Sequence, residues 1–146
     1  MNLYTNKTNT YKEVAVQTSS PAKLVVMLYE GAIRFLRQSI SAIPLKHLSA
    51  KRHSIDRAVA IIQHLQSTLD LQQGQQVAAE LDRLYDYITS RVIEGSGRLD
   101  VAPLEEAIKL LTVLLSGWEE IVKKEQTVPP TLLAQQAANG RFDMHV

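Results

Sequence analysis

The chain of 146 residues contains no cysteine, which excludes disulfides, thiolate catalysis, iron–sulfur clusters and cysteine-ligated zinc. Its six glycines and five prolines are too few for the many tight turns of an all-β fold. No run approaches the roughly 20 apolar residues that a membrane-spanning helix needs, so we expect no membrane insertion. The polar stretch over residues 1–20 lacks the apolar middle region of a signal peptide, which favours a cytoplasmic location.

A large excess of charge of one sign is also missing. The formal net charge is +1, which argues against nucleic acid or another polyanion as the partner of the whole chain. Residues 1–79 carry nine Lys/Arg against four Asp/Glu, whereas residues 80–146 carry seven against eleven. If the two halves pack together, their opposite charges attract each other, and we favour this explanation over a patch that binds nucleic acid.

Apolar residues recur at spacings of three and four along four segments, which is the pattern of amphipathic helices. Four such helices joined by short connections predict an all-α, antiparallel up-down four-helix bundle. We expect the bundle to occupy residues 20–126, after an N-terminal arm of residues 1–19 and before a mobile C-terminal tail of residues 127–146. The expected helices cover residues 21–43, 48–69, 76–94 and 100–124.

The ends of these helices have recognisable signals. Ser20 is expected to cap the first helix, with Pro21 at its first position, and Asp100 is expected to cap the fourth. Gly74 can take a left-handed conformation after the second helix. Residues 95–97 (GSG) are expected to end the third helix.

The first helix carries more apolar surface than one buried face requires. One stripe consists of Val25, Leu28, Ala32, Leu36, Ile40 and Ile43. A second stripe, displaced by roughly a third of a turn at 100° per residue, consists of Leu24, Met27, Gly31 and Phe35. A surface helix usually has one apolar stripe, so we expect this helix to be covered on two sides. Because glycine inside a helix costs about 1 kcal/mol relative to alanine, Gly31 predicts the close approach of another backbone.

No arrangement of residues predicts a catalytic or metal centre. A di-iron bundle requires Glu-x-x-His on inward faces, and the sequence contains none. The adjacent pairs Glu105-Glu106 and Glu119-Glu120 do not face each other on a helix and suit a solvated face. We therefore expect no enzyme, no metal and no cofactor. A metal- or haem-bearing bundle enzyme is the alternative, which metal analysis would test.

Two surfaces leave alternatives open. A basic cluster of Lys46, Lys51, Arg52 and Arg57 fits a solvated face, an acidic partner or, least well, nucleic acid, because no aromatic residues are interleaved. The second stripe of the first helix can bury against the apolar points of the N-terminal arm, accept another chain, or pack against an identical subunit. Periodicity does not decide among these, and we expect a monomer or a weak homodimer.

Several segments, in order along the chain, resemble the FliS family of flagellar secretion chaperones. Residues 19–24 (SSPAKL) and 27–36 (MLYEGAIRFL) resemble its pattern S-P-x-x-L-x-x-M-L-Y-D-G-A-I-x-F-L. Further similar segments are residues 11–18 (YKEVAVQT), 67–70 (STLD) with Gly74, 81–88 (LDRLYDYI), 100–111 and 118–120 (WEE). The resemblance spans about residues 10–122, and the chain departs from it with Glu30 for the usual aspartate and with Gln75, Gln76, Ser90 and Gly95.

This resemblance implies a function that composition alone does not. It implies a cytoplasmic bundle that binds the C-terminal region of unassembled flagellin, prevents premature polymerisation and assists flagellar type III export, in contact with components of the export machinery. It also implies that the N-terminal arm, through Tyr11, Val14 and Val16, covers a hydrophobic groove. Tyr85 suits either that groove or the bundle core, and Trp118 suits the core. The expected groove residues are Leu24, Met27, Leu28, Gly31, Phe35, Tyr85 and Tyr87.

Overall fold

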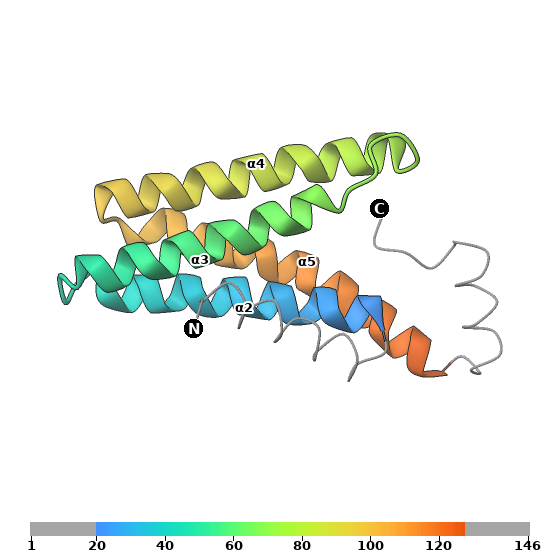
Figure 1. The fold of residues 1–146 in the computed structure, drawn as a ribbon, viewed down its shortest axis with the longest axis horizontal. Coiled ribbons are helices and arrows are strands. Elements are labelled where there is room, and N and C mark those ends of the chain that lie inside the picture. Colours follow the sequence, from blue (N-terminus) through green and yellow to red (C-terminus); the bar gives the residue numbers. More distant parts are fainter. Residues whose placement is uncertain (1–19, 128–146) are drawn as a thin grey trace, which may run out of the picture.

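A computed structural model describes residues 20–127, which form a bundle of four helices. Each helix packs against its neighbour in the chain, and the last packs back against the first (Figure 1). This arrangement confirms the predicted antiparallel up-down four-helix bundle. The predicted arm and the tail beyond Thr127 lie outside the described residues. The helices are α2 (Pro21–Ala42), α3 (Leu48–Ser67), α4 (Gln75–Arg98) and α5 (Val101–Thr127).

The core contains apolar side chains from all four helices. The first stripe of α2 enters it with Val25, Leu28, Ala32 and Leu36, and α2 packs against both α3 and α5, as expected for a helix covered on two sides. Fully burying one such aliphatic side chain contributes about 1.5–3 kcal/mol to stability. The largest fully buried apolar side chains are Tyr29, Leu36, Ile62, Ile88, Val92, Leu104 and Leu111.

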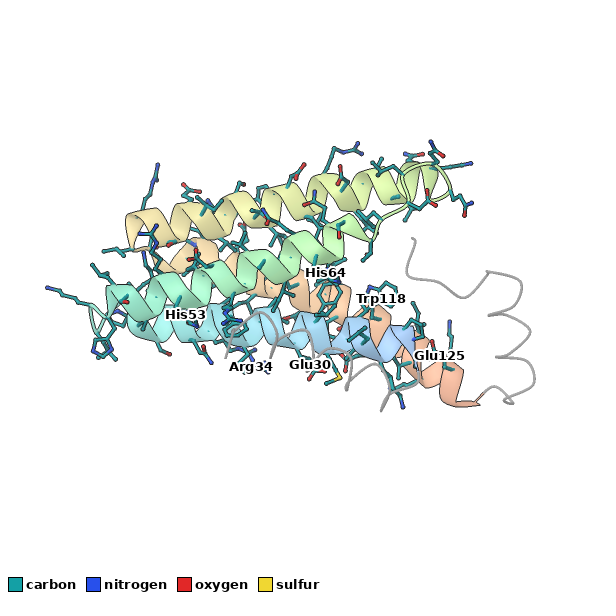
Figure 2. The ribbon with its side chains drawn as sticks, viewed as in Figure 1. Glu30, Arg34, His53, His64, Trp118 and Glu125 are labelled. Atoms are coloured by element: carbon teal, nitrogen blue, oxygen red, sulfur yellow. The ribbon has the colours of Figure 1, made fainter. Side chains whose placement is uncertain are left out.

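Two predicted helix caps are confirmed. The Ser20 hydroxyl oxygen accepts a hydrogen bond from the Lys23 backbone N–H at 3.4 Å, and the Asp100 carboxylate accepts one from the Ala102 N–H at 3.0 Å. Ser20 also donates to the carboxylate of Glu125 at 2.6 Å, which joins the start of α2 to the last turns of α5 (Figure 2). The helix α5 extends beyond its expected end at residue 124.

The prediction that the third helix ends at residues 95–97 is wrong, because α4 continues to Arg98. The chain turns at Leu99, which has a φ of 53°, and the Asp100 N–H bonds back to the Gly95 carbonyl at 2.9 Å. Gly95 is buried, and a Cβ there would lie 2.8 Å from Leu104 Cγ and 2.9 Å from the Asp100 carbonyl oxygen. The glycine therefore permits α5 to approach α4 closely and does not break the helix.

The expected left-handed conformation of Gly74 is also wrong. Gly74 has a φ of −73°, and the positive φ of 51° falls on Gln75, the first residue of α4. The Asp70 carbonyl accepts from the Gly74 N–H at 2.7 Å, which holds Gly74 in a compact turn with an ordinary φ. At Gly31 the nearest atom to an added Cβ is the side-chain Cδ1 of Ile61, at 3.5 Å. This is an ordinary contact with a side chain of α3. No backbone atom of another helix within residues 20–127 lies within 4 Å of that position, and the close approach of another backbone stays a prediction.

Within residues 20–127, no helix combines the length and the apolar character that crossing a membrane requires.

Candidate functional site

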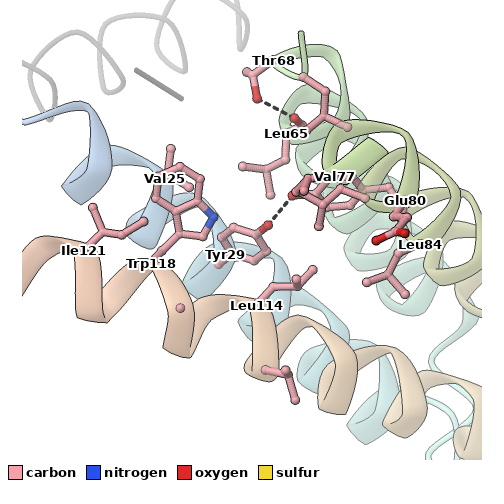
Figure 3. Close-up of a pocket in the computed structure, with 15 residues that line it drawn as sticks. Val25, Tyr29, Leu65, Thr68, Val77, Glu80, Leu84, Leu114, Trp118 and Ile121 are labelled. Carbon is pink, nitrogen blue, oxygen red and sulfur yellow. Dashed lines mark hydrogen bonds between the residues drawn. The ribbon is translucent and has the colours of Figure 1, made fainter. Parts of the chain in front are cut away.

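An apolar groove of about 460 Å³ opens between α4 and α5, with its floor formed by side chains of α2 and α3 (Figure 3). We call it the α4–α5 groove. Among its lining residues only Glu80 carries a formal charge, and most of the others are aliphatic or aromatic. Its lining consists of Val25, Tyr29, Leu65, Thr68, Leu69, Val77, Glu80, Leu81, Leu84, Tyr85, Val113, Leu114, Gly117, Trp118 and Ile121.

The groove exists because α4 and α5 pack together at one end and separate toward the other (Figure 1). Toward the start of α4, several apolar side chains of each helix are not covered by the other helix. Val77 is 53% exposed on α4, while Val113 is 65% and Ile121 37% exposed on α5. Soluble proteins rarely leave contiguous apolar surface open unless it binds something, so this groove is the leading candidate for a binding site.

The floor of the groove contains two buried tyrosines whose hydroxyls hydrogen-bond to each other, Tyr29 and Tyr85 (Figure 3). Burial raises the pKa of Tyr29 far above its ordinary value, with a further increase from Tyr85 and a smaller opposing effect of a hydrogen bond from Trp118. Burial also raises the pKa of Tyr85, although the bond from Tyr29 opposes that shift. Both phenols are therefore neutral at physiological pH, and the floor is uncharged.

The mostly apolar lining of the groove is suited to binding. Glu80 lies at the exposed rim, where its carboxylate accepts a hydrogen bond from the Gln76 side chain at 3.2 Å. In the stretch from Ser20 to Thr127, no group of three or more His, Asp or Glu side chains could hold a metal ion. What the groove can do is cover the apolar face of another segment.

The structure brings only one of the residues expected to form a groove, Tyr85, into the α4–α5 groove. Tyr85 is 4% exposed and belongs to the core as well, so both of its expected roles apply. Tyr87, two positions further on, is 46% exposed and does not line the groove, and its hydroxyl donates to Glu106.

The expected groove residues of α2 lie elsewhere. Leu28 and Gly31 are buried, Leu24 and Phe35 are partly buried and pack against the core, and Met27 is 45% exposed. None of them lines the α4–α5 groove. The residues expected to form the cover, Tyr11, Val14 and Val16, lie outside the described residues.

Sequence reasoning missed most of the groove. Tyr29 belongs to neither predicted stripe of the first helix, yet it lines the groove. Trp118, expected in the core, is partly exposed and lines the groove as well. A signal for the groove was present on the last helix. Val113, Gly117 and Ile121 recur every four residues beside the buried stripe of Leu104 and Leu111, which is the pattern of a second apolar face.

Two polar surfaces are weaker candidates. A depression of about 510 Å³ between α2 and α5 is larger than the α4–α5 groove, but Glu30, Arg34 and Arg37 line it, and Figure 2 shows Glu30 and Arg34 on the outer side of α2. In the basic cluster, Lys51 donates to the Ser96 carbonyl at 3.0 Å and so joins α3 to α4. This bond gives one member of the cluster a structural role.

Comparisons with known proteins identify the class of protein to which this chain is similar. Curated relatives are flagellar secretion chaperones: FliSB of Pseudomonas aeruginosa is 33% identical over 109 residues, which cover 75% of this chain and 86% of that protein. FliS of Vibrio cholerae is 31% identical over 115 residues (76% and 85%), and FliS of Salmonella typhimurium is 32% identical over 113 residues (77% and 84%). Residues 4–125 also match the family model described as flagellar protein FliS. The chain belongs to the FliS family.

Proposed function

We propose that this protein binds the C-terminal segment of unassembled flagellin in the α4–α5 groove, in the cytoplasm, and thereby prevents premature polymerisation and assists flagellar type III export. The observation that supports this proposal is an apolar groove that residues 20–127 leave open, in a member of a chaperone family. The protein acts by binding alone, without a catalytic step, and hands its client to components of the export machinery.

The chemistry of the groove supports a helical or extended client with an apolar face. Amphipathic segments bind by laying that face into a hydrophobic groove, and exposed Val77, Val113 and Ile121 provide matching walls. A client that is unfolded beforehand must become ordered on binding, which moderates its affinity and allows release. The uncharged floor imposes no requirement for an ionised client group.

We further propose that the N-terminal arm, through Tyr11, Val14 and Val16, competes for this apolar surface when no client is bound. The time that the arm spends closed would lower the apparent affinity for the client by the same fraction. Partly exposed residues of the second stripe of α2, Met27 and Phe35 among them, would extend the contact area around the bundle.

The test is a calorimetric titration of the full-length chain with a peptide from the C-terminal segment of flagellin. Val113→Glu is expected to weaken binding at least tenfold, because a carboxylate placed in an apolar contact loses its hydration. Val113 is 65% exposed, so the fold should tolerate the change. The matched control is Ile93→Glu, which alters an apolar residue that is 57% exposed and lies outside the groove.

Equal effects of Val113→Glu and Ile93→Glu would contradict binding in the groove. Light scattering with and without the peptide gives an independent check. If Val113→Glu instead dissociates a dimer that is indifferent to peptide, the groove is a self-association surface and the proposal fails.

A further inference from the structure

The floor of the α4–α5 groove has more hydrogen-bond donors than it can satisfy. Its donors are the hydroxyls of Tyr29 and Tyr85. The two hydroxyls share one hydrogen bond, which uses one of their two protons. One hydroxyl proton is therefore left over.

The remaining proton belongs to the Tyr29–Tyr85 pair. Either hydroxyl can donate in the bond that they share, and the tyrosine that accepts keeps its own proton free. No other group among residues 20–127 accepts a hydrogen bond from either hydroxyl. The remaining polar groups of the lining are engaged elsewhere, since Thr68 donates to the Leu65 carbonyl at 2.6 Å and Glu80 accepts from Gln76 at the rim.

We propose that the hydroxyl pair of Tyr29 and Tyr85 is a specificity-determining donor, which selects a client segment that carries a neutral oxygen acceptor within its apolar face. The acceptor would be the side-chain oxygen of Ser, Thr, Asn or Gln. This inference rests on the proposed function, and it adds the chemistry by which the groove distinguishes one apolar segment from another. A buried donor without a partner costs free energy, so a client with no acceptor binds more weakly.

A neutral acceptor fits the site better than a carboxylate does. No Lys or Arg lines the groove, and the single ionised lining group, Glu80, is itself negative. A carboxylate brought to the floor would lose its hydration and gain only bonds from neutral donors. The shape of the floor also matters, because Tyr85 is 4% and Tyr29 1% exposed, so an acceptor must project from the client to reach the hydroxyl.

The first experiment uses the full-length protein and a peptide from the C-terminal segment of flagellin. Each Ser, Thr, Asn and Gln of the peptide is replaced in turn by an apolar residue of similar shape, such as Thr→Val or Gln→Met. We expect one position at which this loss of oxygen weakens binding about tenfold, the typical effect of leaving a buried donor unpaired. The other positions should change affinity by less than about twofold.

The second experiment repeats the scan with protein variants that lack the tyrosine hydroxyls. In the double variant Tyr29→Phe/Tyr85→Phe the sensitive position should lose its effect, because no hydroxyl proton remains on the floor, whereas either single variant keeps one. Tyr87→Phe is the matched control, since Tyr87 is an exposed tyrosine outside the groove whose hydroxyl bonds Glu106. Thermal unfolding of each variant verifies that it is folded.

The outcomes separate this inference from the proposed function. If the unmodified peptide does not bind, the proposed function fails. If it binds and no oxygen-removing change weakens binding more than twofold, the donor role alone is overturned, even when the double variant does not fold. A sensitivity that survives in the double variant would overturn the assignment of the donor to the tyrosine pair. A sensitive position at Asp or Glu, weakened by Asp→Asn or Glu→Gln, would overturn the choice of a neutral acceptor.

Discussion

The pair α4 and α5 is closed at one end and open at the other, although both ends carry apolar side chains. At the closed end Gly95 lets Leu104 approach to within contact, and Arg91 bonds Glu106 across the two helices at 3.0 Å. At the open end Val77 and Val113 are left exposed. The difference shows that apolar content alone does not close a helix pair. At the closed end a buried glycine also permits close approach, and polar groups pair across the two helices.

The largest expected effect is on the closed end. Gly95→Ala should lower the free energy of unfolding by about 1–3 kcal/mol, the usual cost of overpacking, because its Cβ would meet both Leu104 and the backbone oxygen of Asp100. Denaturant unfolding measures this change. Gly97→Ala is the control, because a Cβ at Gly97 has no atom within 4 Å and alanine favours the helix. An equal loss of unfolding free energy in both variants would show that contact of the added Cβ with Leu104 and Asp100 is not the cause.

A smaller effect is expected on the open end. Removal of residues 1–17 should raise the affinity for the flagellin peptide several-fold, since the competing arm would be gone. Calorimetry with the full-length and shortened chains measures the ratio. Unfolding midpoints of both chains provide the control, because they show whether the bundle is intact. A fall in affinity would mean that the arm forms part of the binding surface.

The smallest effect concerns the ion pairs of the closed end. The hydrogen bond from Tyr87 lowers the pKa of the Glu106 carboxyl below its ordinary value, and Arg91 contributes to the same shift. A lowered pKa stabilises the fold above the ordinary value of 4.5, and this contribution is lost as the pH falls through the lowered pKa. Wild type should therefore exceed Glu106→Gln in thermal midpoint at pH 7, with the difference shrinking below about pH 4.

Glu105→Gln is the control for that comparison. Glu105 directly precedes Glu106 in α5 and is exposed. It forms no ion pair or hydrogen bond with the described part of the chain. Its replacement should leave the pH dependence of the midpoint unchanged. A pH-independent difference between wild type and Glu106→Gln would mean that the Glu106 carboxylate does not act through its charge.

Much of the fold was predictable because its signals are local. The spacing of apolar residues indicated four helices, and the caps at Ser20 and Asp100 follow from short polar side chains at helix starts. The groove was not predictable in the same way. Its position depends on where α4 and α5 separate, and that depends on contacts such as Gly95 with Leu104, which join residues of different helices.

The family motifs and the groove geometry also differ in what they reveal. The motif around Met27 and Phe35 in α2 correctly indicated the family, but none of its expected groove residues in α2 lies in the α4–α5 groove. A motif can stand out because it builds the core, as Leu28 and Tyr29 do here. The lining of the groove combines motif residues, such as Tyr29 and Leu84, with residues outside the motifs, such as Val113.

The single tryptophan of the chain lies in the wall of the groove, which gives the molecule an intrinsic optical probe. Trp118 is partly exposed, and its indole ring lies between Val25, Tyr29 and Ile121 in Figure 3. A guest that displaces water from this ring would move its fluorescence to shorter wavelength. Occupancy of the groove by a tryptophan-free peptide can therefore be followed by emission spectroscopy, without labels.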